Sequence, residues 1–576
     1  MTRADRSRRA KPAMLDARAL ARTLRRTFGI TTLREGQERV IARVLDAKDT
    51  LAIMPTGAGK SLCYQLPALH LRGTTVVVSP LIALMKDQAD RLRDVGVDAV
   101  QLNSTLTEAD EREALARIAR RAVRIVFATP ERMTDAETLE ALRTAGVPLF
   151  VIDEAHCISQ WGHDFRPSYL ELATALEALG EPPVLALTAT ATDGAAKDIV
   201  AQLKRPHMAV VQTGIYRENL HYRVLHITND EERIARVVEI VRRTTGSGIV
   251  YAATVGVAES LAGSLRAEAV RVGLYHGRMS ARGRRDAQDA FMDGRLDVMV
   301  ATNAFGLGID KPDVRYVLHA QMPGSIEAYY QEAGRGGRDG EVTKCTLLFD
   351  LRDRRVQQFF LTRRYPDAGQ IESVVNAILG LAREAPVPFA KLREALPQVS
   401  AVKIKVAIKL LVDAGAVVRR PGGSVALAER GASAAAMSHE RIAELARGYA
   451  EKAECDQERL ERMMFYAQTG LCRWRVLLDY FGETLEREQC GHCDNCVRAK
   501  RRERAPERSV QATDGGSGAQ KRRRRSYATG DAVRVPRYGS GRVRSVAGEE
   551  ITIEFANGDA RTFLRSYVRP SRSAGA

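Results

Sequence analysis

Residues 54–61 (MPTGAGKS) have the composition of a loop that holds phosphate groups. Glycines let backbone N–H groups turn toward phosphate oxygens, a lysine meets the β- and γ-phosphates, and a hydroxyl binds Mg²⁺. The general pattern begins with glycine where this chain has Met54, but the segment follows an expected strand and opens an expected helix, as the motif requires. We expect ATP and Mg²⁺ to bind here, through Thr56, Gly57, Gly59, Lys60 and Ser61.

A second segment with catalytic potential, residues 151–156 (VIDEAH), closes another apolar strand. A carboxylate at the carboxyl end of a strand is well placed to hold Mg²⁺, and this is the role we expect for Asp153. Glu154 lies one residue further and is the expected group that orients and activates water. The two segments in this order predict hydrolysis of a nucleoside triphosphate.

Four cysteines have the spacing C-x17-C-x2-C-x2-C. Four thiolates suit tetrahedral Zn²⁺, and an iron–sulfur cluster with the same ligands is the alternative. We expect the first cysteine to open a helix, the other three to lie on a following loop, and His492 to be a bystander. The predicted ligands are Cys472, Cys490, Cys493 and Cys496.

Further segments with recognisable patterns surround these motifs. They are residues 28–37 (FGITTLREGQ), 79–88 (SPLIALMKDQ), 159–167 (SQWGHDFRP), 188–190 (TAT), 301–312 (ATNAFGLGIDKP) and 331–340 (QEAGRGGRDG). Together with the phosphate loop, the DEAH residues and the four cysteines, they resemble the RecQ family of superfamily 2 DNA helicases. The resemblance covers residues 20–350 and 460–500.

The resemblance implies roles for residues on both sides of the nucleotide. Arg335, our first candidate, and Arg338, our second, would reach the γ-phosphate from the second domain, where a guanidinium contributes about 10³–10⁵ in rate in comparable enzymes. Ile30 stands where the family often has an aromatic residue that stacks on the base. The remaining implied nucleotide contacts are Arg34 and Gln37 at adenine, with Gly308, Asp310 and Gln331.

The aromatic-rich loop implies contact with DNA. In the family this loop couples DNA binding to ATP hydrolysis, and here it contains Trp161, Phe165 and Arg166. Aromatic rings offer faces on which unpaired bases stack, and an arginine adds positive charge. The resemblance further implies movement from 3′ to 5′.

Short apolar stretches alternate with helical patterns through the first 350 residues, which predicts buried parallel strands. The expected strands are Thr50–Met54, Thr75–Ser79, Ile125–Thr129, Leu149–Asp153 and Val184–Thr188, then Ser247–Ala252, Arg271–Tyr275, Asp297–Thr302, Val314–His319 and Thr343–Phe349. The expected fold class is therefore α/β, with two tandem doubly wound domains that meet near residues 205–215. The helicase resemblance implies that both domains are RecA-like.

The texture changes after residue 360. Helical stretches end in a glycine-turned hairpin, which favours a winged helix, with a helical spacer as the alternative. The predicted organisation is a basic tail (1–15), RecA-like domain 1 (16–208), RecA-like domain 2 (209–360), a winged-helix-like unit (365–435), a zinc-binding helical module (436–500), a basic linker (501–526) and a small SH3-like β-barrel (527–570).

Two of these segments suggest further binding. The winged-helix-like unit lies at a different place from the family's usual winged helix, and our hypothesis is that it grips duplex DNA. The barrel resembles the Tudor-type tail of UvrD/PcrA helicases, which implies docking of a protein partner such as RNA polymerase. A role in stability or DNA contact is the alternative for the barrel.

The formal net charge of +17 is concentrated near the ends, with +4 in residues 1–12 and +8 in residues 498–525. Such segments favour contact with nucleic acid, and a solvated tail is the alternative. The N-terminus lacks the apolar stretch of a signal peptide, so we expect no disulfide framework. No apolar run approaches the ~20 residues of a membrane span. We expect a cytoplasmic, nucleoid-associated bacterial protein without membrane contact.

These observations predict an ATP-dependent DNA helicase that uses ATP, Mg²⁺ and Zn²⁺. Its expected substrates are single-stranded and forked duplex DNA in repair or recombination. One alternative is an RNA helicase. The other is a recruitment protein that uses ATP as a switch and docks partners through its C-terminal barrel.

Overall fold

The computed structural model describes residues 17–159, 166–306, 311–364, 366–381, 386–420, 424–428, 439–503, 527–535, 538–547, 550–555, 558 and 560–571. The chain forms two compact units. The first contains Met1–Ala320, Glu327–Leu348 and Phe465–Ala576, and the second contains Gln321–Ile326 and Phe349–Met464. Within the described ranges, no helix is long and apolar enough to cross a membrane.

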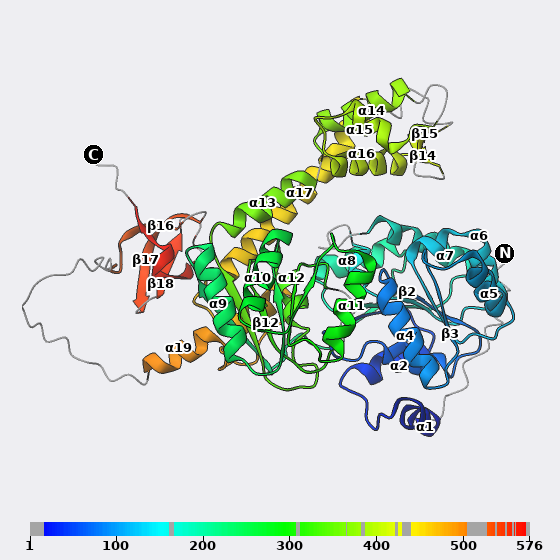
Figure 1. Ribbon diagram of the computed structural model, residues 1–576, viewed down its shortest axis with the longest axis horizontal. Coiled ribbons are helices and arrows are strands. Elements are labelled where there is room, and N and C mark those ends of the chain that lie inside the picture. Colours follow the sequence, from blue (N-terminus) through cyan, green and yellow to red (C-terminus); the bar gives the residue numbers. More distant parts are fainter. Residues whose placement is uncertain are drawn as a thin grey trace, which may run out of the picture. The chain divides into compact units, whose positions relative to one another are not determined.

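A parallel sheet of seven strands, in the order β3-β4-β2-β5-β6-β1-β7, opens the first unit (Figure 1). Its strands are β1 (Thr50–Ile53), β2 (Thr75–Val78), β3 (Ala99–Leu102), β4 (Ile125–Ala128), β5 (Phe150–Ile152), β6 (Val184–Thr188) and β7 (Ala209–Gln212). Leu51 and Ile53 of β1 enter one apolar cluster, while Ala52 enters another. Both faces of this sheet are therefore buried, as expected for parallel strands.

Helices connect the strands of this sheet. They are α1 (Ala17–Phe28), α2 (Gln37–Leu45), α3 (Leu62–Ala68), α4 (Ile82–Asp94), α5 (Glu108–Ala119), α6 (Ala136–Ala145), α7 (Leu172–Ala178) and α8 (Asp193–Gln202), with 3₁₀ turns η2 (Pro130–Thr134), η3 (Ala155–Cys157) and η4 (Pro167–Glu171). Thr107, Asp135 and Thr192 each accept a hydrogen bond from the backbone N–H three residues later. These N-caps explain where α5, α6 and α8 begin.

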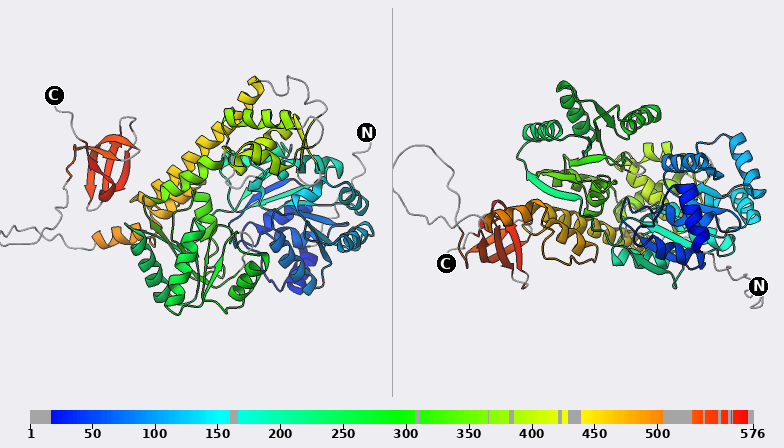
Figure 2. Two further views of the ribbon diagram at one scale, coloured as in Figure 1. Left: turned by 45° about the horizontal axis from the view of Figure 1, so that its top comes forward. Right: turned by 90° about the horizontal axis from the view of Figure 1, so that it is seen from below.

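The second sheet has six strands in the order β10-β11-β9-β12-β13-β8. Its elements are β8 (Leu220–His226), α9 (Asp230–Arg243), β9 (Ser247–Tyr251), α10 (Val255–Ala267), β10 (Val272–Tyr275), α11 (Ala281–Met292), β11 (Val298–Ala301), β12 (Val314–His319), α12 (Ile326–Ala333) and β13 (Thr343–Phe349). Ile249 and Val250 enter apolar clusters on opposite faces, and helices flank the sheet in all views (Figures 1 and 2).

All ten expected strands are present, which confirms two tandem RecA-like domains. Strands β3, β7 and β8 were not predicted. β7 pairs in parallel with β1, and Ala209 lies opposite Thr50. Residues 209–212 therefore belong to the first sheet, and the predicted boundary after residue 208 is wrong because it lies too early.

The second compact unit contains a small core of helices and a hairpin. After α13 (Asp353–Arg364) it has α14 (Ala368–Leu381), α15 (Phe389–Ala395), α16 (Ala401–Asp413), β14 (Val417–Arg419) and β15 (Val425–Leu427). Val387, before α15, forms an antiparallel bridge with Val425. Three helices and this small sheet share one apolar core. Three helices followed by a hairpin are compatible with a winged helix, and membership of that class stays a prediction.

The chain leaves this unit along α17 (His439–Gln468) and continues into α18 (Arg473–Tyr480) and α19 (Asp494–Glu503). Helix α19 corrects one prediction, because residues 501–503 are helical rather than part of the basic linker. Asp494 lies 3.9 Å from Arg498 one turn later, a spacing that supports a helix. The basic N-terminal tail and residues 504–526 lie outside the described residues.

The described C-terminal region is an antiparallel sheet in the order β19-β18-β17-β16-β20. Its elements are β16 (Ala532–Val535), β17 (Gly539–Ala547), β18 (Glu550–Phe555), β19 (Ala560–Leu564), η6 (Arg565–Tyr567) and β20 (Arg569–Pro570). Phe465 of α17 packs against its apolar core, and Thr469 bridges to Phe563. Its membership of the SH3-like class stays a prediction.

Candidate active site and metal centre

Three predicted motifs lie at one edge of the first sheet. β5, β6 and β1 are neighbours, and all three are parallel. The DEAH residues follow β5, the TAT residues end β6 and the phosphate loop follows β1. Because the carboxyl ends of parallel strands share an edge, these loops are brought together although they are far apart in sequence.

The phosphate loop turns sharply between β1 and α3. Gly57 and Gly59 have φ of 86° and 77°, a region that favours glycine. Lys60 Nζ donates a hydrogen bond to the Met54 carbonyl at 3.2 Å. Burial lowers the pKa of Lys60; Glu154 and Asp153 oppose this shift, whereas the positive charge of Arg338 adds to it. The lysine is thus held in the loop and faces both predicted acidic residues.

The two residues expected to read adenine contact the phosphate loop instead. Gln37 is buried, and its Nε2 donates to the carbonyls of Ala58 and Gly59, each at 3.0 Å. Arg34 donates to the Gly57 carbonyl. A Cβ on Gly59 would lie only 2.4 Å from Gln37 Nε2, so glycine is required for this contact. Contact of these side chains with adenine stays a prediction.

The acidic pair follows β5 directly. Asp153 N–H donates to the Val78 carbonyl at 2.8 Å, and the Tyr169 hydroxyl donates to the Asp153 carbonyl at 3.1 Å. Burial raises the pKa of Asp153 to about 7, with a further contribution from Glu154 and an opposing one from Lys60. A divalent cation would favour the ionised carboxylate, since nearby positive charge stabilises it. Oxygen ligands from Ser61 and Asp153 match the preference of Mg²⁺.

A series of polar contacts leads from Glu154 to the second domain. Glu154 Oε2 lies 3.3 Å from His156 Nδ1, which lies 3.1 Å from Thr188 Oγ1. The Thr188 hydroxyl donates to the Thr190 carbonyl at 3.0 Å. Gln331 Nε2 donates to Thr190 Oγ1 at 3.2 Å. The predicted Gln331 therefore contacts the TAT segment of the first sheet.

The two predicted arginines face different surroundings. A Cβ on Gly57 would lie 3.5 Å from Arg338 Cγ, so Arg338 lies against the phosphate loop. Arg335 Nη2 lies 3.7 Å from the position of a Cβ on Gly306, and the Arg335 charge opposes the burial that raises the pKa of Tyr251. Arg338 is thus the arginine for which a contact with the phosphate loop is observed, and the order of the two candidates stays a prediction. Arg335 Nε is buried and has no hydrogen-bond partner within the described chain.

Several predicted residues cannot be placed. Trp161, Phe165, Gly308 and Asp310 lie outside the described residues. Arg166 is described, and it donates from Nη1 to the Pro80 carbonyl at 3.4 Å. That contact joins Arg166 to the segment of residues 79–88.

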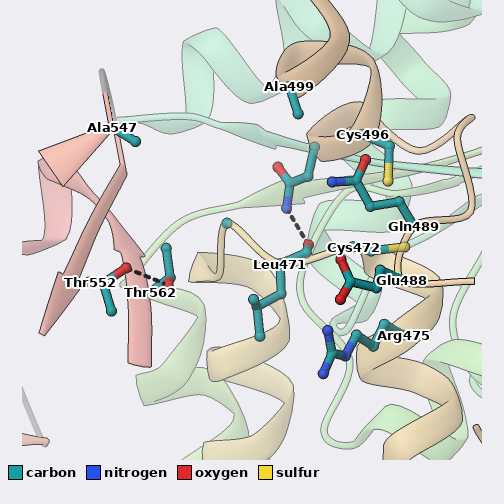
Figure 3. Close-up of a pocket in the computed structure, with 12 residues that line it drawn as sticks. Leu471, Cys472, Arg475, Glu488, Gln489, Cys496, Ala499, Ala547, Thr552 and Thr562 are labelled. Atoms are coloured by element: carbon teal, nitrogen blue, oxygen red, sulfur yellow. Dashed lines mark hydrogen bonds between the residues drawn. The ribbon is translucent and has the colours of Figure 1, made fainter. Parts of the chain in front are cut away.

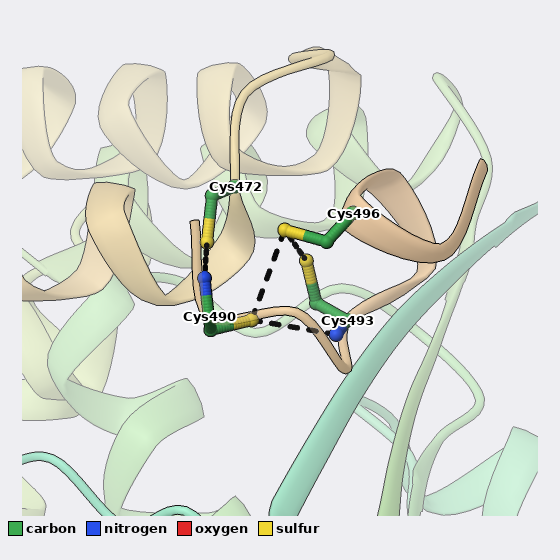
Figure 4. Close-up of side chains that lie close together, drawn as sticks. All are labelled: Cys472, Cys490, Cys493 and Cys496. Carbon is green, nitrogen blue, oxygen red and sulfur yellow. Dashed lines mark hydrogen bonds between the residues drawn. The ribbon is translucent and has the colours of Figure 1, made fainter. Parts of the chain in front are cut away.

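The four predicted zinc ligands converge (Figure 4). Their sulfur atoms all lie within 4.8 Å of one another. Cys493 and Cys496 are separated by 3.4 Å between sulfurs, and Cys490 and Cys496 by 3.9 Å. Tetrahedral Zn²⁺ with Zn–S of about 2.3 Å requires sulfurs about 3.8 Å apart, so this donor set fits the ion. No disulfide joins these cysteines.

The surroundings of the cysteines confirm part of the prediction and correct part. Cys472 caps the start of α18, as expected. Cys496 lies on α19 rather than on a loop. His492 stacks on His221 at 4.6 Å between ring centroids and is outside the cysteine cluster. Backbone N–H groups of Arg473 and Cys493 donate to the sulfurs of Cys493 and Cys490, both at 3.4 Å.

The zinc module holds the segment that joins the two sheets. Glu483 accepts hydrogen bonds from Gln212 Nε2 at 2.7 Å and from Ile215 N–H at 2.9 Å. Trp474 Nε1 donates to the Leu220 carbonyl at 3.1 Å. The sequence analysis did not identify Glu483 as a contact residue. Its partners are 268 and 271 residues away, so no local pattern reveals them.

The fully buried Arg473 is the ionic centre of the module. It pairs with Asp494 at 2.9 Å and donates to the Tyr466 carbonyl. Asp494 also accepts from Val224 N–H at 3.1 Å. This ion pair therefore links α18, α19 and β8, and a buried pair is strongly destabilised when one partner is removed.

A cavity of about 250 Å³ separates the zinc module from the C-terminal sheet. Figure 3 shows Cys472, Arg475 and Glu488 on one side, and Thr552 and Thr562 on the other. The two threonine hydroxyls hydrogen-bond to each other at 2.9 Å. The sheet is therefore seated beside the metal centre rather than against the nucleotide motifs.

Comparison with known proteins agrees with the order of these sites. Three family models match: DEAD/DEAH box helicase over residues 34–199, helicase conserved C-terminal domain over 232–340, and RecQ zinc-binding over 436–497. The last model supports zinc at the four cysteines.

Two relatives from Bacillus subtilis (strain 168) cover different amounts of the chain. The probable ATP-dependent DNA helicase RecS is 36% identical over 488 residues, which is 82% of this chain and 92% of the relative. The ATP-dependent DNA helicase RecQ is 47% identical over 336 residues, which is 58% of this chain and 56% of the relative. The chain thus matches little more than half the length of that RecQ protein.

A solved structure of the Mycobacterium smegmatis helicase Lhr, bound to single-stranded DNA and AMP-PNP, is similar in fold. Its TM-score is 0.51 at 21% identity, and the match covers 75% of this chain and 63% of that one.

Proposed function

Because the chain belongs to the RecQ family of superfamily 2 DNA helicases, we propose that it uses ATP hydrolysis to move along DNA and separate its strands. One observation carries this proposal: Lys60, Asp153 and Glu154 meet at one edge of the first sheet, and Arg338 approaches the same phosphate loop from the second domain. A nucleotide held by both domains can change the position of one domain relative to the other when it is hydrolysed.

Each residue has a proposed part in hydrolysis. Lys60 holds the β- and γ-phosphates, and Glu154 orients the attacking water and accepts its proton. Arg338 stabilises the charge that develops in the transition state, with Arg335 in support. Mg²⁺, when bound by Ser61 and Asp153, would neutralise phosphate charge. Arg34 and Gln37 would recognise the base, and the predicted residues Thr56, Gly57, Gly59, Gly308, Asp310 and Gln331 would complete the site.

The proposed track is single-stranded DNA next to a forked duplex, followed from 3′ to 5′. Trp161 and Phe165 would stack on bases, and Arg166 would contact phosphate. The relatives named as DNA helicases support DNA rather than RNA as the polymer. Repair or recombination is the proposed process.

The winged helix is proposed to bind the duplex ahead of the separated strands. Residues 388–420 carry seven lysines or arginines and two acidic residues, a net charge of +5. Changing Lys403, Lys405 and Lys409 together to glutamine should lower duplex affinity and flatten its salt dependence by about one logarithmic unit per contacting lysine. Unchanged duplex affinity after deletion of residues 366–438 would contradict this part of the proposal.

The C-terminal sheet is proposed to dock a protein partner, with RNA polymerase or a repair protein as the candidate. The proposed location is the bacterial cytoplasm at the nucleoid, where such a motor meets its DNA. Loss of partner capture on deletion of residues 527–571, with ATP hydrolysis unchanged, would support this role.

The decisive experiment measures ATP hydrolysis with single-stranded DNA, single-stranded RNA, duplex DNA and no polymer. Stimulation by single-stranded DNA, lost in Glu154→Gln, is the expected result. Stimulation by RNA would instead favour an RNA helicase. If Lys60→Ala abolished the nucleotide response but left partner delivery intact, the ATP-switched recruitment protein would be favoured.

A further inference from the structure

Arg217 lies in the segment between β7 and β8, which connects the two nucleotide-binding sheets. Its guanidinium donates four hydrogen bonds to backbone carbonyls. Nη1 donates to Gly334 at 2.8 Å and to Thr56 at 3.5 Å. Nη2 donates to Gly336 at 2.8 Å and to Gly337 at 2.6 Å. One side chain thus binds the loop that carries the two arginines and also touches the phosphate loop.

Asn219 binds the same loop from two residues further along. Its Nδ2 donates to the carbonyls of Gly337 at 2.8 Å and Glu341 at 2.9 Å, and its own carbonyl accepts from Thr343 N–H at 2.8 Å. Gly337 has φ of 55°, and a Cβ there would lie 2.5 Å from Asn219 Nδ2. The turn before Arg338 is therefore shaped to receive this amide.

The loop needs external support because it is rich in glycine. Gly334, Gly336 and Gly337 allow many backbone conformations, and ordering such residues costs more entropy than ordering others. Arginine suits the task because its planar group offers five donors in a fixed fork, whereas lysine offers a compact charge without that shape.

We propose that Arg217 and Asn219 are positioning residues for ATP hydrolysis. They fix residues 334–337 so that the following Arg338 faces the phosphate loop, and Arg217 ties that arrangement to Thr56. The proposal rests on the proposed function, since it concerns the same reaction, but it assigns neither residue a contact with the nucleotide.

The test compares full-length wild type with Arg217→Gln and Arg217→Lys in DNA-stimulated ATP hydrolysis. Misplacing Arg338 should lower kcat by roughly 10²-fold in Arg217→Gln, and less in Arg217→Lys, while KM changes little. Affinity for ADP with aluminium fluoride, a transition-state mimic, should fall in parallel, whereas affinity for ADP alone should not. Asn219→Ala, a milder change, should lower kcat by about tenfold.

Arg223→Gln is the matched control, because Arg223 is also partly buried and donates to Thr346 on β13, away from the arginine loop. Arg223→Gln should leave kcat within about twofold of wild type, because a substitution away from the active site usually has a small effect. When Arg338→Ala is already present, adding Arg217→Gln should lower kcat by less than about threefold, because the two residues act as a unit.

Three results would overturn the proposal, and two of them are kinetic. One is a raised KM with unchanged kcat, and the other is full additivity with Arg338→Ala. The third is structural. If Arg217→Gln and Asn219→Ala lost affinity for ADP as strongly as affinity for the transition-state mimic, and also lost thermal stability, their role would be purely structural. A wild-type protein without DNA-stimulated hydrolysis would instead reject the proposed function, on which this inference rests.

Discussion

In the nucleotide site, charged groups from two domains face one loop, whereas in the zinc module the charged groups pair with one another. Burial lowers the pKa of Lys60 and raises that of Asp153, and Arg335 Nε is buried without a partner among the described residues. In the module, Arg473 pairs with Asp494 at 2.9 Å, and backbone N–H groups donate to the sulfurs.

The nucleotide site and the zinc module therefore differ in what their charged groups do. Buried charge is costly, so charged groups that gather around one loop fit a site that a charged ligand completes. A closed set of pairs resists change and suits a fixed support. Glu483 connects the two regions, because it belongs to the module and holds the segment before Arg217.

The largest effect should follow loss of the metal. Cys493→Ser removes one of four thiolates, and structural zinc contributes on the order of 10 kcal/mol to folding in small metal domains. We expect about one zinc per wild-type chain, none in the variant, and release of the module to limited proteolysis. Cys455→Ser, a cysteine outside the cluster, should keep its zinc. Iron with absorbance near ~400 nm would instead indicate the cluster alternative.

The next largest effect should come from Arg338. Arg338→Ala should lower kcat by about 10³-fold, or about 4 kcal/mol in activation free energy, because a guanidinium at the phosphate stabilises transition-state charge. Arg335→Ala should cost less, since it faces Tyr251 and Gly306. Steady-state ATP hydrolysis with saturating single-stranded DNA measures both. A larger loss of kcat in Arg335→Ala would support Arg335 as the first candidate, the order predicted from the sequence.

A smaller effect should follow weakening of the contact between the two regions. Glu483→Gln replaces a charged acceptor of the Ile215 N–H by a neutral one, and such bonds contribute about 1.5–3 kcal/mol. We expect the Ile215 amide to exchange with deuterium about tenfold faster, with zinc content unchanged. Glu488→Gln, an exposed carboxylate of the same module, is the control. Equal exchange in both variants would show that Glu483 does not support this segment.

The smallest effect should be the pH dependence of the packing of the C-terminal sheet against β8 of the same chain. Burial lowers the pKa of His226 to about 4, with a contribution from Arg473, and its Nδ1 hydrogen-bonds the Tyr567 hydroxyl. Because this pKa lies below the usual value near 6.5, the neutral ring stabilises this packing fully above that pH, and the stabilisation is lost as pH falls toward 4. Part of the ring meets solvent, so we expect a modest shift.

Thermal unfolding at pH 7.5 and 5.5 measures this effect. Wild type should lose slightly more stability at the lower pH than His226→Gln, which cannot gain the proton. An equal loss of stability in both proteins would show that protonation of His226 does not affect the packing of the C-terminal sheet.

The sequence predicted the nucleotide and zinc residues because their signals are local. The phosphate loop joins a strand to a helix within eight residues, and three cysteines lie within seven residues. By contrast, β7 is a short edge strand whose Val210 remains exposed, so it lacks the apolar run of a central strand. Helix α19 is so highly charged that it reads as a linker, and its start is set by the cysteine cluster.

Arg217 and Asn219 could not be predicted, because they bind backbone oxygens of glycines. Such contacts leave no complementary side chain in the sequence, and the partners lie more than 100 residues away. The contact of Arg338 with the phosphate loop was hard to foresee for a related reason. Arg335 and Arg338 are three residues apart, and the turn at Gly337, with its positive φ, decides which one meets the phosphate loop.

The distance in sequence between Gln212 and Glu483 has a consequence for synthesis. These partners are 271 residues apart, and Leu220 and Trp474 are 254 apart. At about 5–20 residues per second, the ribosome makes the second partner roughly 15–50 s after the first, while earlier domains already fold. Each new molecule therefore passes through a stage in which both nucleotide-binding sheets exist and the segment between them is unsupported. A chain truncated before Cys472 would remain in the state that a longer chain leaves once Trp474 and Glu483 have been made.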